Sequence, residues 1–181
     1  KHVNSKKPEY AIVNSIGMIT EDRRGTGILG CLSINDNTAI ASYKNYTNNG
    51  VIDQKKVDAV VKDSIQKLNI KTPSGKTLIQ SLSGGNQQKV IIARWLANNP
   101  DILIMDEPTR GIDVGTKTEI QKLVVKLASQ GMAVVFISSE IEEMLRTCDR
   151  MVVMRDGAKV GELSGNEMNQ SSIMSTIAGG Q

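Results

Sequence analysis

The sequence predicts an α/β domain whose mostly parallel, buried sheet is flanked by helices. Two continuous apolar runs, ILIM at 102–105 and AVVFI at 133–137, are typical of strands that are buried on both faces. Segments with the helical spacing of apolar residues alternate with these runs, as in proteins built from strand–helix–strand units. The length of 181 residues is enough for one domain with a sizeable core.

One strand and two helices are expected in the N-terminal half. A loose polar lead-in over 1–8 precedes a strand near 16–19, and a Gly-, Asn- and Thr-rich stretch follows over 24–50. A further helix over about 86–98 begins after SLSGG and ends at NNP. Between the stretch over 24–50 and this helix, an amphipathic helix over 54–68 is predicted by the helical spacing of Val57, Val60, Val61, Ile65 and Leu68.

Strands and helices alternate in the C-terminal half as well. After the strand that ends in DE, a helix is stopped by Gly131; its apolar positions are Ile120, Leu123, Val124 and Leu127. The second apolar run is followed by a short helix near 140–146. RMVVM and AKVGEL, joined by a turn at Asp156-Gly157, predict a hairpin, and the tail over about 165–178 is expected to be helical.

Composition excludes several classes of function. Aromatic residues make up 3% of the chain, which argues against stacking platforms for nucleic acid. The net charge of +3 is mild and the basic residues are scattered, so no nucleic-acid partner is expected. His2 is the single histidine, which excludes multi-histidine metal sites and triads. Cys31 and Cys148 form no metal-type pair and are expected as free thiols in a reducing compartment. No apolar run reaches membrane-spanning length.

The segment SGKT at 74–77 matches only the end of a phosphate-binding P-loop. The full pattern, G-x-x-x-x-G-K-[ST], requires glycine at the position of Ile70. A strand should precede such a loop and a long helix should follow it, whereas here a helix precedes it and five residues separate Thr77 from Ser83. We therefore interpret the segment as an ordinary Pro-Ser-Gly turn.

Residues 81–90, SLSGGNQQKV, are typical of the beginning of a helix. Ser83 can cap the helix, and Gly84 and Gly85 allow another group to approach the backbone closely. Unpaired N–H groups and the positive end of the helix dipole favour an anion at such a position.

Two acidic residues follow the strand over 102–105. Asp106 and Glu107 emerge at its carboxyl end, which is the edge where open parallel sheets bind ligands. An Asp in this position can hold Mg²⁺, and the next acid can orient or deprotonate an attacking water. The alternative is a pair of solvated acids at the start of a loop before Pro108.

Taken together, these motifs resemble the ATP-binding cassette (ABC) ATPases. LSGGNQQK resembles the signature motif of that family, ILIMDE its Walker B strand, and the segment 110–113 its D-loop. The resemblance runs from about Ile16 to Gly161. The motif sequences are similar to those of the second cassette in the two-cassette ATPases that energise bacterial monosaccharide importers. It implies a P-loop NTPase-like α/β fold with a helical subdomain.

The resemblance also implies roles for single residues. Asp106 matches the metal-coordinating position, and Glu107 matches the catalytic base. Ser139 stands where the family usually has a switch histidine, and serine can donate a hydrogen bond but carries no charge near neutral pH. The signature would meet the γ-phosphate of ATP held by an opposing cassette, and Glu21 stands at the Q-loop glutamine. The expected nucleotide-binding residues are Ser83, Gly84, Gly85, Gln87, Asp113 and Glu21.

No P-loop is visible in the sequence, and in this family it lies upstream of the Q-loop. The Walker A strand and loop are therefore expected to precede Lys1, and the chain is expected to be part of a longer one. We predict a partial nucleotide-binding domain over 1–181, with the helical subdomain and signature over about 50–98 and the Walker B, D-loop and C-terminal α/β part over about 99–181. ATP and Mg²⁺ would bind the full-length protein, whereas the chain alone is expected to bind ATP weakly or not at all and not to hydrolyse it.

Partners follow from the resemblance in the same way. They are the first cassette of the same polypeptide, transmembrane permease subunits docked near residues 21–50, and indirectly an extracytoplasmic sugar-binding protein, at the cytoplasmic face of the inner membrane. One alternative is the lobe of a chromosome-organising or DNA-repair ATPase, against which the lack of sustained heptads argues. Another is a non-catalytic regulatory module, against which Asp106 and Glu107 argue.

Overall fold

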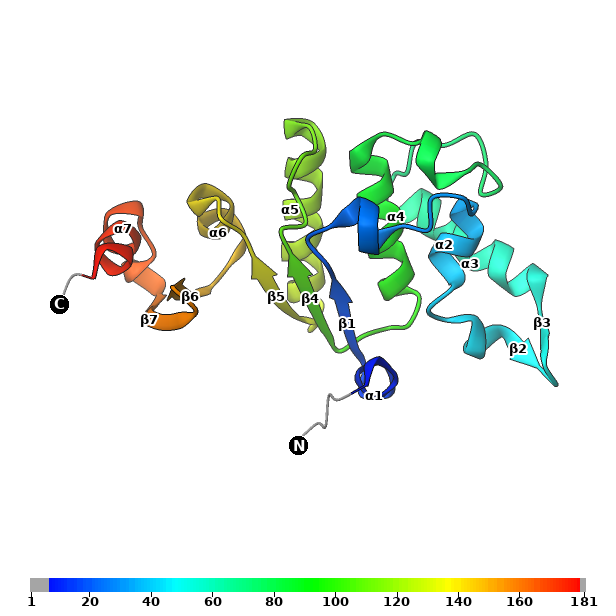
Figure 1. The fold of residues 1–181 in the computed structure, drawn as a ribbon, viewed down its shortest axis with the longest axis horizontal. Helices are drawn as coiled ribbons and strands as arrows, with labels where there is room; N and C mark the ends of the chain where they lie inside the picture. The colour runs from blue at the N-terminus through cyan, green and yellow to red at the C-terminus, as the bar shows by residue number, and fades with distance from the viewer. Residues whose placement is uncertain (1–6, 180–181) are drawn as a thin grey trace.

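The computed structural model describes residues 7–179, and its centre is a parallel sheet of three strands in the order β1-β4-β5 (Figure 1). The strands are β1 (Ile16–Ile19), β4 (Ile102–Asp106) and β5 (Ala133–Ile137). β4 lies in the middle, with Leu103 opposite Gly17 of β1 and Val134 of β5. The three strands expected from the sequence are therefore confirmed, and so is their parallel arrangement.

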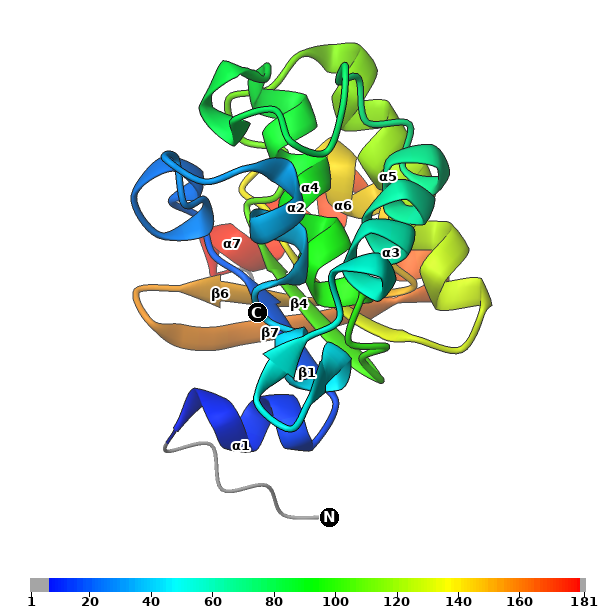
Figure 2. The ribbon, with the colours of Figure 1, turned by 90° about the vertical axis from the view of Figure 1, so that its right-hand side faces the viewer.

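One core joins the sheet to the helices of the chain's middle part, α3 (Gln54–Lys67), α4 (Gly84–Leu96) and α5 (Val114–Ser129). Alternate residues of β4, Leu103 and Met105, are fully buried in this cluster. Figure 2 shows these helices above the central strands and α1 (Pro8–Val13) below them. The division of the chain into parts over about 50–98 and about 99–181 stays a prediction, because one core cluster includes buried residues from both parts.

The Gly-, Asn- and Thr-rich stretch after β1 is ordered into short elements. They are a π-helical turn (Arg23–Gly27), α2 (Ile34–Ala39), a 3₁₀ turn (Tyr43–Tyr46), β2 (Thr47–Asn48) and β3 (Val51–Ile52). The buried Asn37 side chain organises this stretch, since it accepts from the N–H of Leu29 at 2.9 Å and donates to two backbone carbonyls at 3.0 Å. A single buried amide thus replaces the apolar periodicity that sequence patterns can detect.

The predicted helices are confirmed with small shifts at their ends. α4 begins at Gly84, two residues earlier than expected, and is preceded by a 3₁₀ turn (Ile79–Ser81). Residues 74–77 form a turn in which the N–H of Thr77 donates to the carbonyl of Ser74 at 3.3 Å. No long helix follows that turn directly, which agrees with its interpretation as an ordinary turn.

The C-terminal part forms a separate two-stranded sheet. β6 (Arg150–Arg155) and β7 (Ala158–Ser164) form the predicted hairpin, with positive φ at both turn residues, 52° at Asp156 and 77° at Gly157. α6 (Ile141–Thr147) connects β5 to β6. The tail is a 3₁₀ turn (Gly165–Glu167) followed by α7 (Gln170–Ala178), so the expected tail helix is confirmed in its second half.

The structure bears on two further expectations, which concern the cysteines and the presence of membrane-spanning segments. Cys31 and Cys148 are both free thiols, as expected. Among the described residues, no helix combines the length and apolar character needed to cross a membrane. His2 lies outside the described residues.

Candidate functional site

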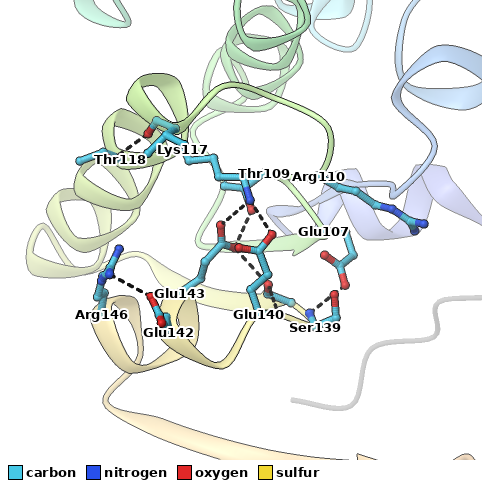
Figure 3. Close-up of polar contacts among 12 residues, drawn as sticks. Glu107, Thr109, Arg110, Lys117, Thr118, Ser139, Glu140, Glu142, Glu143 and Arg146 are labelled. Carbon is cyan, nitrogen blue, oxygen red and sulfur yellow. Dashed lines mark hydrogen bonds and ion pairs between the residues drawn. The ribbon is translucent and has the colours of Figure 1, made fainter. Parts of the chain in front are cut away.

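The carboxyl edge of the sheet brings Glu107 and Ser139 together. Glu107 follows β4 directly and adopts the left-handed conformation, with φ of 46°, which is uncommon for a residue with a side chain. Its N–H donates to the carbonyl of Ile137 at 2.9 Å, and its Oε1 accepts from the N–H of Ser139 at 2.8 Å (Figure 3). The backbone of the loop after β5 therefore fixes the direction of this carboxylate.

Asp106 is the last residue of β4 and pairs with Ile137 of β5. Among the described residues, no side chain or N–H donates a hydrogen bond to its carboxylate, and no group of three or more His, Cys, Asp and Glu residues forms a metal cluster. Mg²⁺ in nucleotide sites is held by one or two carboxylates together with phosphate oxygens and waters. The single available carboxylate of Asp106 fits such a shared site.

Ser83 occupies the N-cap position of α4, but its side chain does not cap the helix. Its Oγ accepts instead from the side-chain amide of Asn86 at 2.9 Å, while the oxygen of that amide accepts from the N–H of Lys71 at 2.8 Å. The expected side-chain cap is therefore wrong: the Ser83 hydroxyl accepts a hydrogen bond from the Asn86 side chain and none from the backbone of α4. The first N–H groups of α4 are left without an acceptor from this side chain.

Close packing accounts for Gly85 of the signature and constrains Gly84 less, because the atom nearest to Gly84 is the end of the flexible Arg23 side chain. A Cβ on Gly84 would lie 2.8 Å from Nη2 of Arg23, and a Cβ on Gly85 would lie 2.6 Å from Cγ2 of Thr116. The sequence suggested glycine for approach to a ligand, and the fold adds the contact with Thr116 as a second reason at Gly85.

Asp113 connects the beginning of α5 to the signature. Its carboxylate accepts from the N–H and the hydroxyl of Thr116, at 2.9 and 2.8 Å, and thereby caps α5. The hydrogen bond from the Thr116 N–H is the main reason why the pKa of this exposed carboxyl is lowered. The same Thr116 side chain packs on Gly85, so the two expected site segments are in contact.

Gln87 is buried and faces the loop before the signature. Its amide donates to the carbonyls of Leu82 at 3.1 Å and Ile79 at 3.3 Å. The structure therefore gives Gln87 a role in shaping the loop that presents Ser83, and its contact with a nucleotide stays a prediction.

Glu21 forms an ion pair with Arg110, and Nη1 of Arg23 donates to the carbonyl of Arg110 at 3.4 Å. The segment after β1 is thus bound to the segment after β4. The sequence analysis included Arg110 in the D-loop segment but predicted neither its ion pair nor a role for Arg23, because isolated basic residues in loops carry no signal beyond surface charge.

Sequence reasoning also missed the buried Glu143 of α6. Its Oε2 accepts from the hydroxyls of Thr109 and Ser138, and Nζ of Lys117 lies 3.5 Å from its Oε1 (Figure 3). Glu143 stands in a run of acids, EIEE, that gives no indication of which side chain is buried.

The fold is an α/β domain that has two acids at the carboxyl end of a parallel sheet and a helix that begins with two glycines. The model of the ABC transporter family matches residues 4–110, more than half of the chain. The chain belongs to this family.

Curated relatives carry the names of sugar importers. A protein of Halalkalibacterium halodurans, provisionally named a ribose/galactose/methyl galactoside import ATP-binding protein, is 49% identical over 96% of this chain and 33% of its own length. The galactose/methyl galactoside import ATP-binding protein MglA of Clostridium tetani is 48% identical over 96% of this chain and 35% of its own length. The chain therefore spans about a third of the length of the curated relatives that it matches.

Solved structures confirm the fold. A dimeric ATP-binding cassette in a post-hydrolysis state with ADP and Pi superposes with a TM-score of 0.70 at 24% identity, covering 86% of this chain and 66% of that one. A nucleotide-free cassette from an ABC transporter gives 0.75 at 21% identity, covering 96% and 70%. The predicted P-loop NTPase-like α/β fold with a parallel sheet is therefore confirmed.

Proposed function

We propose that this chain is part of the ATP-hydrolysing subunit of a bacterial importer for a ribose- or galactose-type sugar. The observation that carries the proposal is the Glu107 carboxylate, held by the Ser139 N–H at the carboxyl edge of the sheet, directly after Asp106. The names of the relatives support the choice of sugar. Further, we propose that the chain comes from the second, C-terminal cassette of a two-cassette polypeptide.

In this proposal the acids act on ATP in the full-length protein. Asp106 would hold Mg²⁺, which when bound neutralises charge on the phosphates. Glu107 would orient and deprotonate the attacking water. Ser139, at the position of the switch histidine, offers an N–H that is already used on Glu107 and a hydroxyl that cannot carry a positive charge. The site built on these acids is therefore expected to turn over slowly.

The signature would serve the opposite site. The N–H groups at the start of α4, with Ser83, Gly84 and Gly85, would bind the γ-phosphate of ATP held by the first cassette. Asp113 would support this contact through Thr116, which packs on Gly85. Glu21 would sense the nucleotide from the Q-loop position, and residues 21–50 would dock on permease subunits at the cytoplasmic face of the membrane. An extracytoplasmic sugar-binding protein would deliver the substrate to the permease.

A groove at the free edge of the parallel sheet supports the prediction that the Walker A strand is not part of this chain. A groove of about 850 Å³ lies between β5, α5, α6, β6 and α7. β5 has the apolar sequence of a central strand, yet Val135 is 48% and Ile137 is 44% exposed, whereas no residue of β4 is exposed. We propose that a strand ending in the P-loop, supplied by the longer polypeptide, pairs with this edge.

Calorimetric titration of the isolated chain with Mg-ATP tests the Walker A proposal. We expect no binding at concentrations that would detect a millimolar dissociation constant. Clear binding would show that the chain holds nucleotide without a P-loop and would contradict the proposal.

ATP turnover of the full-length polypeptide tests the division of labour between the two sites. We expect Ser83→Ala to lower the rate at least tenfold, which corresponds to about 1.4 kcal/mol of transition-state stabilisation, and to lower it more than Glu107→Gln does. Ser81→Ala is the control, since Ser81 is exposed and, within residues 7–179, its hydroxyl donates only to the carbonyl of Leu78. A larger loss from Glu107→Gln than from Ser83→Ala would contradict the assignment.

A further inference from the structure

The buried Glu143 carboxylate contacts both loops that surround Glu107. Its side chain is 3% exposed, whereas Glu140 and Glu142 nearby are 53% and 78% exposed. Its Oε2 accepts from the Thr109 hydroxyl at 2.6 Å and from the Ser138 hydroxyl at 3.0 Å. Thr109 lies two residues after Glu107, and Ser138 lies one residue before Ser139. One oxygen atom therefore connects the two loops.

The Ser138 hydroxyl also forms a hydrogen bond with the backbone of the turn that follows it. While it donates to Glu143, it accepts from the N–H of Glu140 at 3.0 Å. This bond from hydroxyl to backbone closes a turn around Ser139 and directs the Ser139 N–H toward Glu107, which accepts it at 2.8 Å. The orientation of that N–H therefore depends on the direction of the Ser138 hydroxyl, which Glu143 sets.

A buried carboxylate needs compensation for its lost hydration. Two hydroxyl donors provide part of it, and the Lys117 ammonium, 3.5 Å from Oε1, provides a charge of opposite sign. Lys117 also bonds to Glu140 at 2.5 Å, and this bond is the main reason why the pKa of Lys117 is raised, with the charge of Glu143 adding to it. The arrangement keeps Glu143 available as an acceptor at the junction of α5, α6 and the two loops.

We propose that Glu143 is a positioning residue that holds the Ser139 N–H on the Glu107 carboxylate. It acts through Ser138 and Thr109 and touches neither nucleotide nor metal. The importance of Glu107 rests on the proposed ATPase function. The hydrogen bond from the Ser139 N–H to Glu107, however, can be measured without nucleotide. The acceptor atom carries the role, and the negative charge is secondary.

Amide hydrogen exchange of the 181-residue chain, followed residue by residue by NMR, tests the proposal. We expect Glu143→Leu, which removes the acceptor, to speed exchange of the Ser139 N–H at least tenfold. Glu143→Gln keeps one acceptor oxygen for the two hydroxyls and should retain most of the protection. Glu142→Leu is the matched control on the same helix, because Glu142 pairs only with Arg146 at the surface, and it should leave Ser139 unchanged.

A purely structural role would speed all amides together, so the Ser139 rate is compared with that of Ile91 in the centre of α4, which is 1% exposed. If Glu143→Leu does not fold, Ser138→Ala removes the connecting hydroxyl and should expose the same N–H. A Ser139 rate that follows the Ile91 rate in these variants would overturn the proposal. Because this readout uses no ATP, it stands apart from any failure of the proposed ATPase function.

Discussion

At the scale of single residues, tight neighbours constrain the signature segment. Gly85 packs on Thr116, whose hydroxyl is in turn held by Asp113. Thr116 has little freedom to withdraw, because its N–H and hydroxyl are both bonded to the same carboxylate. The glycine thus allows α4 and α5 to approach each other at the point where the two expected site segments meet.

Gly85→Ala should destabilise the chain. Its Cβ would lie 2.6 Å from Cγ2 of Thr116, and overpacking of this kind costs about 1–3 kcal/mol, offset by up to about 1 kcal/mol of helix propensity. Urea unfolding should show a lower midpoint with the same slope. Gly30→Ala is the control, because its Cβ would meet nothing closer than 3.8 Å, and an equal loss there would contradict the packing argument.

Tyr43 is expected to make stability depend on alkaline pH. Burial, with a hydrogen bond to Asp36 of 2.9 Å, raises the pKa of Tyr43 to about 12. Because the folded chain binds this proton more tightly than the unfolded chain does, the stabilisation is complete below about pH 10 and is lost as the pH rises toward 12. Urea unfolding at successive pH values should show this fall, and Tyr43→Phe should reduce it. An identical fall in the Phe variant would assign the effect to other groups.

At the scale of elements, Arg94 connects α4 to the segment after β1. Its guanidinium donates to the carbonyls of Asn37 at 2.6 Å and Gly27 at 2.8 Å, and to the side-chain oxygen of Asn37 at 3.0 Å. Burial lowers the pKa of Arg94, and three acceptors offset this burial: two on Asn37 of α2 and one on Gly27 of the π-helical turn. This fork holds the short elements between 23 and 39 against the signature helix.

Arg94→Lys should destabilise this connection although the charge is kept. An ammonium cannot reproduce the planar fork, and hydrogen bonds from charged groups contribute about 1.5–3 kcal/mol each, so a loss of about 2 kcal/mol in the free energy of unfolding is expected. Arg146→Lys is the control, because Arg146 makes one exposed pair with Glu142 at 3.2 Å. Similar small losses in both variants would show that the fork adds little.

The regular elements could be predicted from sequence because their signals are local. The helix over 54–68, the strand at 102–106 and the hairpin turn at Asp156-Gly157 each follow from periodicity or turn chemistry within one segment. The short elements between 23 and 39 could not be predicted, since they depend on Asn37 and Arg94 and hence on contacts across up to 67 positions.

The candidate site divides in the same way. The resemblance assigned both Glu107 and Ser139 to the catalytic site, and the fold brings the Ser139 N–H into hydrogen-bond contact with the Glu107 carboxylate. The motifs could not predict that Asn86 takes the Ser83 hydroxyl, or that Glu143 is the buried acid of its run, because burial is decided by which face of α6 meets the loops. Side-chain partners, unlike positions, are properties of the tertiary structure.

At the scale of the whole molecule, the parallel sheet and the β6–β7 hairpin do not pair with each other. β5 ends the parallel sheet and β6 begins the hairpin (Figure 1). The apolar groove lies between these two strands. A parallel sheet normally has both faces covered and its apolar strands inside. Val152 and Met154 of β6 are 44% and 58% exposed, so both sides of the groove present apolar side chains. Such an edge is a template for pairing with another strand.

We expect the isolated chain to self-associate through this edge. Val135→Lys should suppress the association, because a lysine on an edge strand opposes pairing and burial of the groove. Val125→Lys is the matched control: Val125 is 46% exposed, close to the 48% of Val135, but lies on α5 outside the groove. Sedimentation velocity over a range of concentrations should therefore show larger species for the unmodified chain and for Val125→Lys, and monomers for Val135→Lys. Equal association in all three chains would place the contact elsewhere, and the free edge of β5 would then need no partner strand.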